Sequence, residues 1–313
     1  MYFGSVKFYK HLIYLLIIFT ISFTSIILYN LYTEFVYSES YVVQSYYSVN
    51  DILKIYGTSS FGFNENQINK VENMIPSEPT LTEMEKGGVY YQELYPDLKC
   101  ELPVFKQFDE KKAYLTIDDG PTERTLEILD ILKEKDVKAT FFVVGENTDL
   151  NILKRVHDEG HTIGVHSNSH NFNKIYSSVE DFLDDFYAIY TKIYNVTSEY
   201  PTIFRFPGGS VNSHNLGVYE EIISEMLRRG FVFYDWNIST ADTTKNITSN
   251  KIVENVINQV KNQDKLIILA HDTRDKVQTV KAIPEIIDYL HEQNYTFDRL
   301  TNEVYPINFS YKK

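Results

Sequence analysis

The chain has 313 residues, of which 43% are hydrophobic and 15% aromatic, so it can bury a sizeable core and is too apolar for a disordered protein. Its formal net charge of −13 argues against nucleic-acid binding, because the phosphates would be repelled. The single cysteine, Cys100, excludes both an internal disulfide framework and a cysteine-rich zinc module.

The N-terminal region contains an uncharged apolar run, residues 12–29, of about the length that a bilayer-spanning helix needs. Lys7 and Lys10 precede the run and the next basic residue is Lys54, which predicts a cytoplasmic N-terminus at residues 1–11. We therefore expect a single-pass anchor in the cell membrane, with the rest of the protein outside the cell. The alternative is a cleaved signal peptide and a secreted protein, but no A-x-A cleavage site follows the run.

Residues 30–108 show no sustained hydrophobic period and no motif that carries chemistry. The segment Pro76–Pro79 and the pair Gly87-Gly88 are typical of linkers. We interpret this region as an extracellular stalk, with room for a small ordered element next to a domain at residues 109–308.

From residue 113 onward, short apolar runs alternate with amphipathic stretches of helical length. The runs span residues 113–117, 139–144, 162–165, 202–204, 231–234, 266–270 and 295–297, and the helical stretches span residues 123–135, 150–159, 179–194, 218–229, 249–261 and 277–293. This alternation predicts an α/β fold with a parallel sheet covered by helices. Seven strands favour a distorted (β/α)7-type barrel, with a doubly wound open sheet as the alternative. No glycine-rich nucleotide-binding pattern follows any strand, so we expect no nucleotide.

Ionisable side chains follow five of the predicted strands, at the end where parallel α/β folds place their sites. They are Asp118 and Asp119, His166 and His170, Arg205, Asp235, and His271 with Asp272. Because the carboxyl ends of parallel strands meet at one edge, we expect these groups to form a single site.

Two histidines in this set have the spacing of metal ligands. His166 and His170 are four residues apart, so on a helical turn both imidazoles face one side. With one carboxylate, Asp119, they form a set that leaves positions open for water and substrate, as in catalytic zinc sites. Zn²⁺ or another divalent ion that takes nitrogen and oxygen ligands is the expected cofactor. A pair of surface histidines in a polar loop is the alternative.

The remaining groups suit acid–base chemistry. Asp118 could act as a general base and His271 as a general acid. Arg205 could orient Asp118, and Asp235 could hold His271 as a cation.

Two further features after the strands suit substrate binding. The glycines after Arg205 let the backbone approach a ligand, so an amide N–H there could stabilise an oxyanion. Trp236 offers an apolar face for a sugar ring or an acyl methyl, although a role as a core aromatic competes with this interpretation.

Five motifs in order resemble those of the polysaccharide deacetylases, the NodB-homology group of carbohydrate esterase family 4. The motifs are Thr116–Gly120, His166–His170, Arg205–Gly209, Asp235-Trp236 and Leu266–Asp272. The resemblance covers about residues 112–300 and implies a distorted (β/α) barrel with metal-dependent removal of N- or O-acetyl groups from polysaccharides.

The resemblance also implies roles for individual positions. It makes Asp119, His166 and His170 the metal ligands. It makes Asp118 the base, oriented by Arg205, and His271 the acid, tuned by Asp235. It also implies that Trp236 and Leu269 form the acetyl-methyl pocket and that the Gly208 amide is the oxyanion donor. The first motif has Ile117 where phenylalanine is usual, and the third lacks the aromatic residue that many relatives carry at the position of Gly208.

These observations favour a membrane-anchored extracellular enzyme that removes N-acetyl groups from an acetylated cell-envelope polysaccharide, with peptidoglycan N-acetylglucosamine as the first candidate. Chitin oligomers, poly-N-acetylglucosamine and acetylxylan are alternative substrates. A non-catalytic glycan-binding protein on the same fold is an alternative function. A glycosidase is excluded, because Asp118 and Asp119 are adjacent in sequence and cannot bracket a sugar bond.

Overall fold

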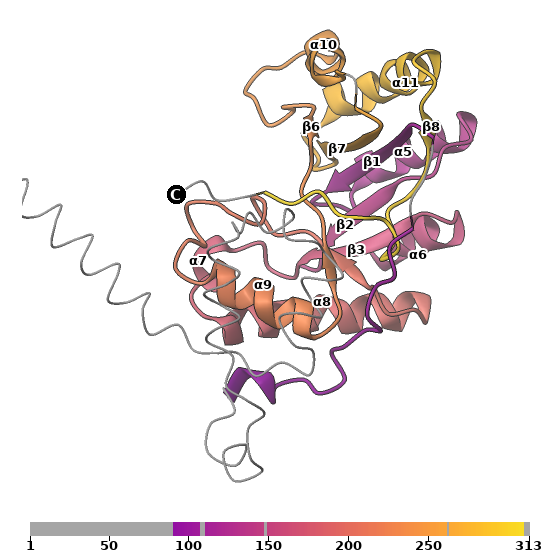
Figure 1. Ribbon diagram of the computed structural model, residues 1–313. Helices are drawn as coiled ribbons and strands as arrows, with labels where there is room; N and C mark the ends of the chain where they lie inside the picture. The colour runs from indigo at the N-terminus through magenta and orange to yellow at the C-terminus, as the bar shows by residue number, and fades with distance from the viewer. Residues whose placement is uncertain (1–89, 107–109, 147–148, 262, 310–313) are drawn as a thin grey trace, which may run out of the picture. The chain divides into compact units, whose positions relative to one another are not determined.

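A computed structural model describes residues 90–106, 110–146, 149–261 and 263–309 (Figure 1). Its strands are β1 (Lys112–Asp118), β2 (Thr140–Val144), β3 (Thr162–Ser167), β4 (Ile203–Phe204), β5 (Val232–Phe233), β6 (Ile238–Ser239), β7 (Lys265–His271) and β8 (Thr296–Phe297). Its helices are the 3₁₀ turn η2 (Tyr90–Gln92), α5 (Glu123–Glu134), α6 (Leu150–Asp158), α7 (Phe172–Ile175), α8 (Val179–Thr197), α9 (Tyr219–Arg228), α10 (Ser249–Gln259) and α11 (Val277–Glu292).

All seven predicted strands and all six predicted long helices are confirmed, whereas β6 and the short α7 were not predicted. The predicted anchor at residues 12–29 lies outside the described residues. In the part of the chain that the structure describes, no helix has both the length and the apolar character needed to cross a membrane.

The strands form one parallel sheet in the order β5-β4-β3-β2-β1-β7-β6. Strand β8 pairs with the first two residues of β1, and β2 pairs with the last three. The order from β1 to β5 follows the chain, as in a barrel, rather than reversing as in a doubly wound sheet. No pairing among the described strands joins β5 to β6, so the predicted barrel is observed as an open half-barrel. Figure 1 shows α10 and α11 beside β6 and β7, and α8 beside β3.

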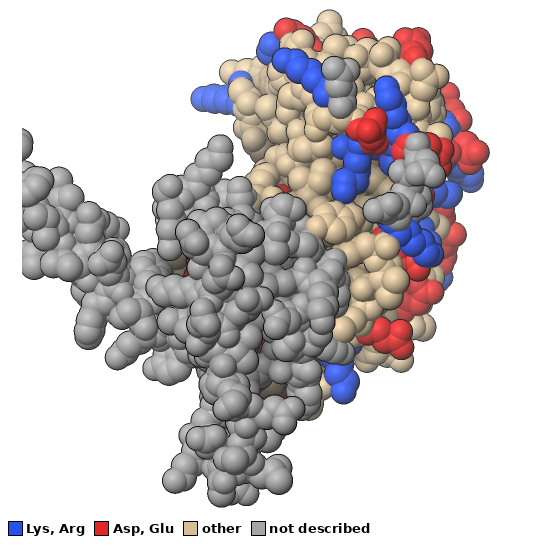
Figure 2. Space-filling model, in the orientation of Figure 1, with Lys and Arg blue, Asp and Glu red and all other residues tan. Residues whose placement is uncertain are grey.

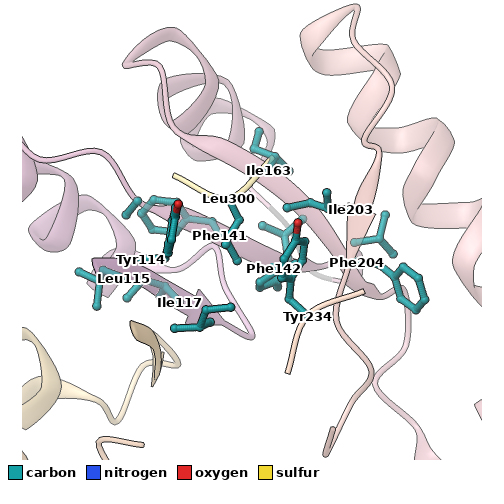
Figure 3. Close-up of a cluster of buried hydrophobic side chains, with 14 of the residues drawn as sticks. Tyr114, Leu115, Ile117, Phe141, Phe142, Ile163, Ile203, Phe204, Tyr234 and Leu300 are labelled. Carbon is teal, nitrogen blue, oxygen red and sulfur yellow. The ribbon is translucent and has the colours of Figure 1, made fainter. Parts of the chain in front are cut away.

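The core lies against the sheet and explains why the strands are continuous apolar runs. Six of the seven residues of β1 are buried, because in a half-barrel helices cover the outer face of the strands and core side chains fill the inner face. Figure 3 shows side chains of β1, β2, β3 and β4 packed together with Tyr234 and Leu300. Burying each large apolar side chain of this kind stabilises the fold by about 1.5–3 kcal/mol.

Charged side chains of both signs are mixed over the described part of the face shown in Figure 2. That part of the face therefore presents no broad surface of one charge, even though the whole chain has a net charge of −13.

Residues 90–100 form a strap that packs against α8 and the C-terminal end of α9, within the region that the prediction assigned to the stalk. Arg229 directly follows α9, and its side chain donates hydrogen bonds of 2.8–3.2 Å to four carbonyl groups within Tyr91–Leu98. Its Nε donates to Glu225 Oε1 at 2.6 Å, and its carbonyl accepts from the Cys100 N–H at 2.8 Å. Arg229 and Glu225 are 4% and 0% exposed, so this buried charge pair fixes the strap to the domain.

Replacing Arg229 by methionine should therefore lower the free energy of unfolding by about 3 kcal/mol, because buried carbonyl groups lose their donor. Urea unfolding of the purified protein measures this change. Lys251→Met is the matched control, since it breaks an exposed pair with Glu254 and should leave the midpoint in place. Equal midpoints for the two variants would contradict the role given to the strap.

Candidate active and metal site

The ends of β1 and β3 bring the three predicted metal ligands together. The Nε2 atoms of His166 and His170 lie 3.5 and 3.3 Å from Asp119 Oδ1. Among the described residues, Asp119 Oδ1 is buried and has no hydrogen-bond partner. A cation between a buried carboxylate oxygen and two imidazole nitrogens would compensate the carboxylate, and this donor set fits a divalent ion that takes nitrogen and oxygen ligands.

The tautomer of His166 suits metal binding. Its Nδ1 lies 2.8 Å from the carbonyl oxygen of Arg205, which only accepts hydrogen bonds, so Nδ1 carries the proton. The Nε2 lone pair is therefore directed at Asp119 and not at the protein backbone. Burial lowers the pKa of His166 to about 3, so the imidazole is neutral at physiological pH and can act as a ligand.

An acid that sequence reasoning missed shapes the turn between the two histidines. Asp185, on the buried face of α8, accepts hydrogen bonds from Ser167 Oγ at 2.5 Å, Asn168 N at 2.7 Å and Ser169 N at 2.9 Å. Ser167 Oγ in turn accepts from His170 N at 2.8 Å. The signal in the sequence was an aspartate among the apolar positions of an amphipathic helix, where a carboxylate needs partners.

The proposed base, Asp118, is 2% exposed and is held by the fully buried Arg205. Arg205 Nη1 donates to Asp118 Oδ1 at 2.9 Å and to Thr116 Oγ1 at 2.7 Å, and its Nε donates to Tyr234 O at 2.8 Å. Burial raises the pKa of Asp118, against the lowering effect of the positive charges of Arg205 and His271. The predicted pairing of Arg205 with Asp118 is therefore present.

The structure corrects the predicted partner of His271, which is Asp242 and not Asp235. His271 Nδ1 lies 2.7 Å from Asp242 Oδ1, and the His271 N–H donates to Asp242 Oδ2 at 2.8 Å. Burial lowers the pKa of His271, but the hydrogen bond and negative charge of Asp242 outweigh it and raise the pKa to about 9. The prediction chose Asp235, which directly follows β5. The partner that the structure shows is Asp242, which follows the unpredicted strand β6.

Asp235 has a different set of partners. Its fully buried carboxylate accepts hydrogen bonds from the Ser210 N–H at 2.8 Å, from Ser210 Oγ at 2.5 Å and from the Phe309 N–H at 2.6 Å. Asp235 therefore connects the loop that follows Arg205 to the C-terminal segment.

The glycine loop after Arg205 lies against aromatic rings. Gly208 and Gly209 have φ values of 78° and 87°, which favour glycine. A Cβ at Gly208 would lie 3.0 Å from the ring of Phe172, which packs edge-on against His170 with the ring centroids 5.2 Å apart. Within the described residues the Gly208 N–H has no hydrogen-bond acceptor, so it is available to a ligand.

The two predicted pocket residues come from different segments of the chain. The ring of Trp236 is partly buried, with the guanidinium carbon of Arg205 5.7 Å from its centroid. Leu269 lies in β7, two residues before His271, and is 7% exposed.

A cavity of about 660 Å³ borders Asp119 and lies between the N-terminal ends of α5 and α6. Its lining includes the acids Glu123, Glu146 and Asp149, with Arg274 from the loop after β7. Among its described lining residues Asp119 is the one that belongs to the proposed site, so the cavity lies beside that site.

Comparisons with known proteins match this arrangement to one family. The family model described as polysaccharide deacetylase matches residues 105–229. A peptidoglycan-N-acetylglucosamine deacetylase from Bacillus cereus is 36% identical over 214 residues, which cover 66% of this chain and 75% of that protein.

Two solved structures share the fold. The catalytic domain of a peptidoglycan N-acetylglucosamine deacetylase from Eubacterium rectale is 34% identical with a TM-score of 0.62, covering 66% of this chain and 96% of that one. A polysaccharide deacetylase from Bacillus cereus is 33% identical with a TM-score of 0.57, covering 64% and 97%. The chain belongs to the polysaccharide deacetylase family of hydrolases.

Proposed function

We propose that this protein is a zinc-dependent deacetylase that hydrolyses the N-acetyl group of peptidoglycan N-acetylglucosamine. The proposal is carried by Asp119 Oδ1, which has no hydrogen-bond partner in the described part of the chain and lies near two histidine Nε2 atoms. The adjacent Asp118 is held by a buried arginine. These two environments support a ligand role for Asp119 and a base role for Asp118. Both the Bacillus cereus relative and the Eubacterium rectale structure carry the name of a deacetylase of this substrate, which supports its choice.

Asp119, His166 and His170 would hold the ion. When bound there, a Zn²⁺ ion would lower the pKa of a water molecule and polarise the acetyl carbonyl. His166 is prepared for this by the hydrogen bond of its Nδ1 to Arg205 O, and His170 by the turn that Asp185 organises.

Asp118 and His271 would divide the proton transfers between them. Asp118 takes a proton from the attacking water, and Arg205 holds its carboxylate in one orientation. His271 is a cation at neutral pH because Asp242 stabilises the charge, so it can give a proton to the departing amine.

The acetyl group would lie between the glycine loop and two apolar side chains. The Gly208 N–H, which has no acceptor among the described residues, would donate to the oxyanion that forms from the acetyl carbonyl. Trp236 and Leu269 would contact the acetyl methyl group, where apolar surface excludes water.

The proposed location of the enzyme follows from the apolar run at residues 12–29. We propose that this run anchors the protein in the cell membrane with its catalytic domain outside, within reach of the peptidoglycan. A secreted form after signal cleavage is the alternative, and membrane fractionation of the native protein distinguishes the two.

Acetate release from purified peptidoglycan fragments, chitin oligomers, poly-N-acetylglucosamine and acetylxylan tests the proposed function. We expect the fastest release from peptidoglycan fragments, its loss with a chelator and its recovery with Zn²⁺. Faster release from another polymer would replace the substrate, and release that a chelator does not affect would contradict the metal site.

Replacing Asp118 by asparagine should lower kcat for acetate release by about 10²–10⁴-fold, because the base loses its charge while Arg205 stays in place. Asp184→Asn is the control, since this exposed acid on α8 bonds only Tyr95 among the described side chains. Unchanged release by Asp118→Asn would overturn the assignment of the base.

Replacing Asp185 by asparagine should weaken Zn²⁺ binding by about 10–100-fold, because the turn between His166 and His170 loses its acceptor. Calorimetric titration of metal-free protein measures the affinity, and Asp184→Asn again serves as the matched control from the same helix. Equal affinities would show that Asp185 does not organise the metal site.

The pH profile of kcat tests the corrected partner of His271. The general acid must be protonated, so activity is present below its pKa and falls as the pH rises through about 9. In Asp242→Asn this alkaline limb should move toward 6.5 or below, because burial then acts on His271 without a compensating charge. Asp235→Asn should leave the alkaline limb of the kcat profile in place. A shift of this limb in Asp235→Asn and not in Asp242→Asn would instead support the predicted pairing of His271 with Asp235.

A further inference from the structure

The C-terminal segment, residues 305–309, is bound to the residues that follow β5. The Asp235 N–H donates to Ile307 O at 2.9 Å, and the Phe309 N–H donates back to Asp235 Oδ2 at 2.6 Å. In Figure 1 this segment is the yellow trace that continues beyond β8. Two hydrogen bonds of this kind fix the position of Phe309 relative to its neighbour in the site, Trp236.

The side chain of Phe309 lies against Trp236 and the glycine loop. The two rings pack edge to face, with centroids 4.8 Å apart and an interplanar angle of 76°. A Cβ at Gly209 would lie 2.8 Å from Phe309 Cε2 and 3.3 Å from Trp236 Cη2, so only glycine leaves room for both rings. Trp236, Phe309 and the glycine loop therefore meet at one point beside the proposed oxyanion donor.

We propose that Phe309 is a positioning residue that fixes Trp236 and thereby limits the acyl pocket to an acetyl group. This inference rests on the proposed deacetylase function. Asp235 acts in the same unit, because its carboxylate joins Ser210 of the glycine loop to the Phe309 backbone. Asp235 therefore does not bind His271 but holds together the two segments that contact Trp236.

The physical argument is one of packing. An edge-to-face aromatic pair contributes about 0.5–1.5 kcal/mol beyond the area that it buries, so without Phe309 the indole loses a preferred orientation. Removing the ring also leaves space beside Trp236 into which the indole can move. Pockets discriminate one methylene group by their size, so a looser wall should admit a propionyl group.

The test compares N-acetylated and N-propionylated glucosamine oligomers of equal length as substrates of the full chain. In Phe309→Ala, which keeps the N–H donated to Asp235, the ratio of propionyl to acetyl kcat/KM should rise about tenfold. Phe309→Tyr should keep the wild-type ratio because it retains the ring. Phe309→Pro should raise the ratio at least as far as Phe309→Ala, since it removes both the ring and the N–H donated to Asp235, and a wild-type ratio in this variant would contradict the inference.

Phe297→Ala is the matched control. Phe297 is also a partly buried phenylalanine in the C-terminal part of the chain, but its ring contacts His291 and not Trp236. This variant should leave the acyl ratio unchanged. A ratio that changes equally in Phe297→Ala and Phe309→Ala would overturn the inference, because general loosening would explain it.

Fluorescence gives a readout that does not depend on activity, because Trp236 is the single tryptophan of the chain. Phe309→Ala should shift the emission to longer wavelength and increase quenching by acrylamide, whereas Phe309→Tyr and Phe297→Ala should not. If the wild type releases acetate but Phe309→Ala changes neither the propionyl-to-acetyl ratio of kcat/KM nor the acrylamide quenching of Trp236, this inference alone is overturned. A wild type that releases no acetate from any substrate would overturn the proposed function, and the inference with it.

Discussion

The site depends on the burial of one guanidinium group. Arg205 is fully buried, and a cation in that position is tolerated only where a counter-charge and hydrogen bonds compensate for the loss of water. Its side chain meets Asp118, Thr116 and the carbonyl of Tyr234, and its own carbonyl fixes the tautomer of His166. Arg205 thus joins the proposed base Asp118 on β1 to the proposed ligand His166 on β3, and this link holds the two strand ends in one relative position.

The sequence predicted the parts of this arrangement that follow from local pattern. Continuous apolar strands such as Lys112–Asp118 identified the sheet, and the groups at the strand ends identified Asp119, His166 and His170. What it missed was non-local. Asp242 lies 29 residues before His271, and Asp185 lies 18 residues after Ser167, so only packing brings them to their partners. Strand β6 has two residues, too few for a periodic signal.

Two adjacent aspartates at the end of β1 have opposite environments. Asp118 faces a buried cation, whereas Asp119, at a φ of 80°, turns to two histidines. The backbone conformation at Asp119 is one that non-glycine residues rarely adopt, and it separates the two side chains. Two adjacent carboxylates on one surface would repel each other. Here Asp118 pairs with an arginine and Asp119 faces two histidines, which reduces that repulsion.

The strap described above has a consequence for the order in which the chain can fold. Its contacts with Arg229 join residues up to 138 positions apart. Its carbonyl groups therefore lack this donor until the end of α9 has been synthesised, although Tyr95 and Asp97 can already contact α8. The C-terminal segment imposes the same condition at the other end, because Phe309 N reaches back 74 positions to Asp235. Closing such long loops costs entropy before any contact forms, which makes folding slow and cooperative. The native domain is thus complete only when both ends have been made.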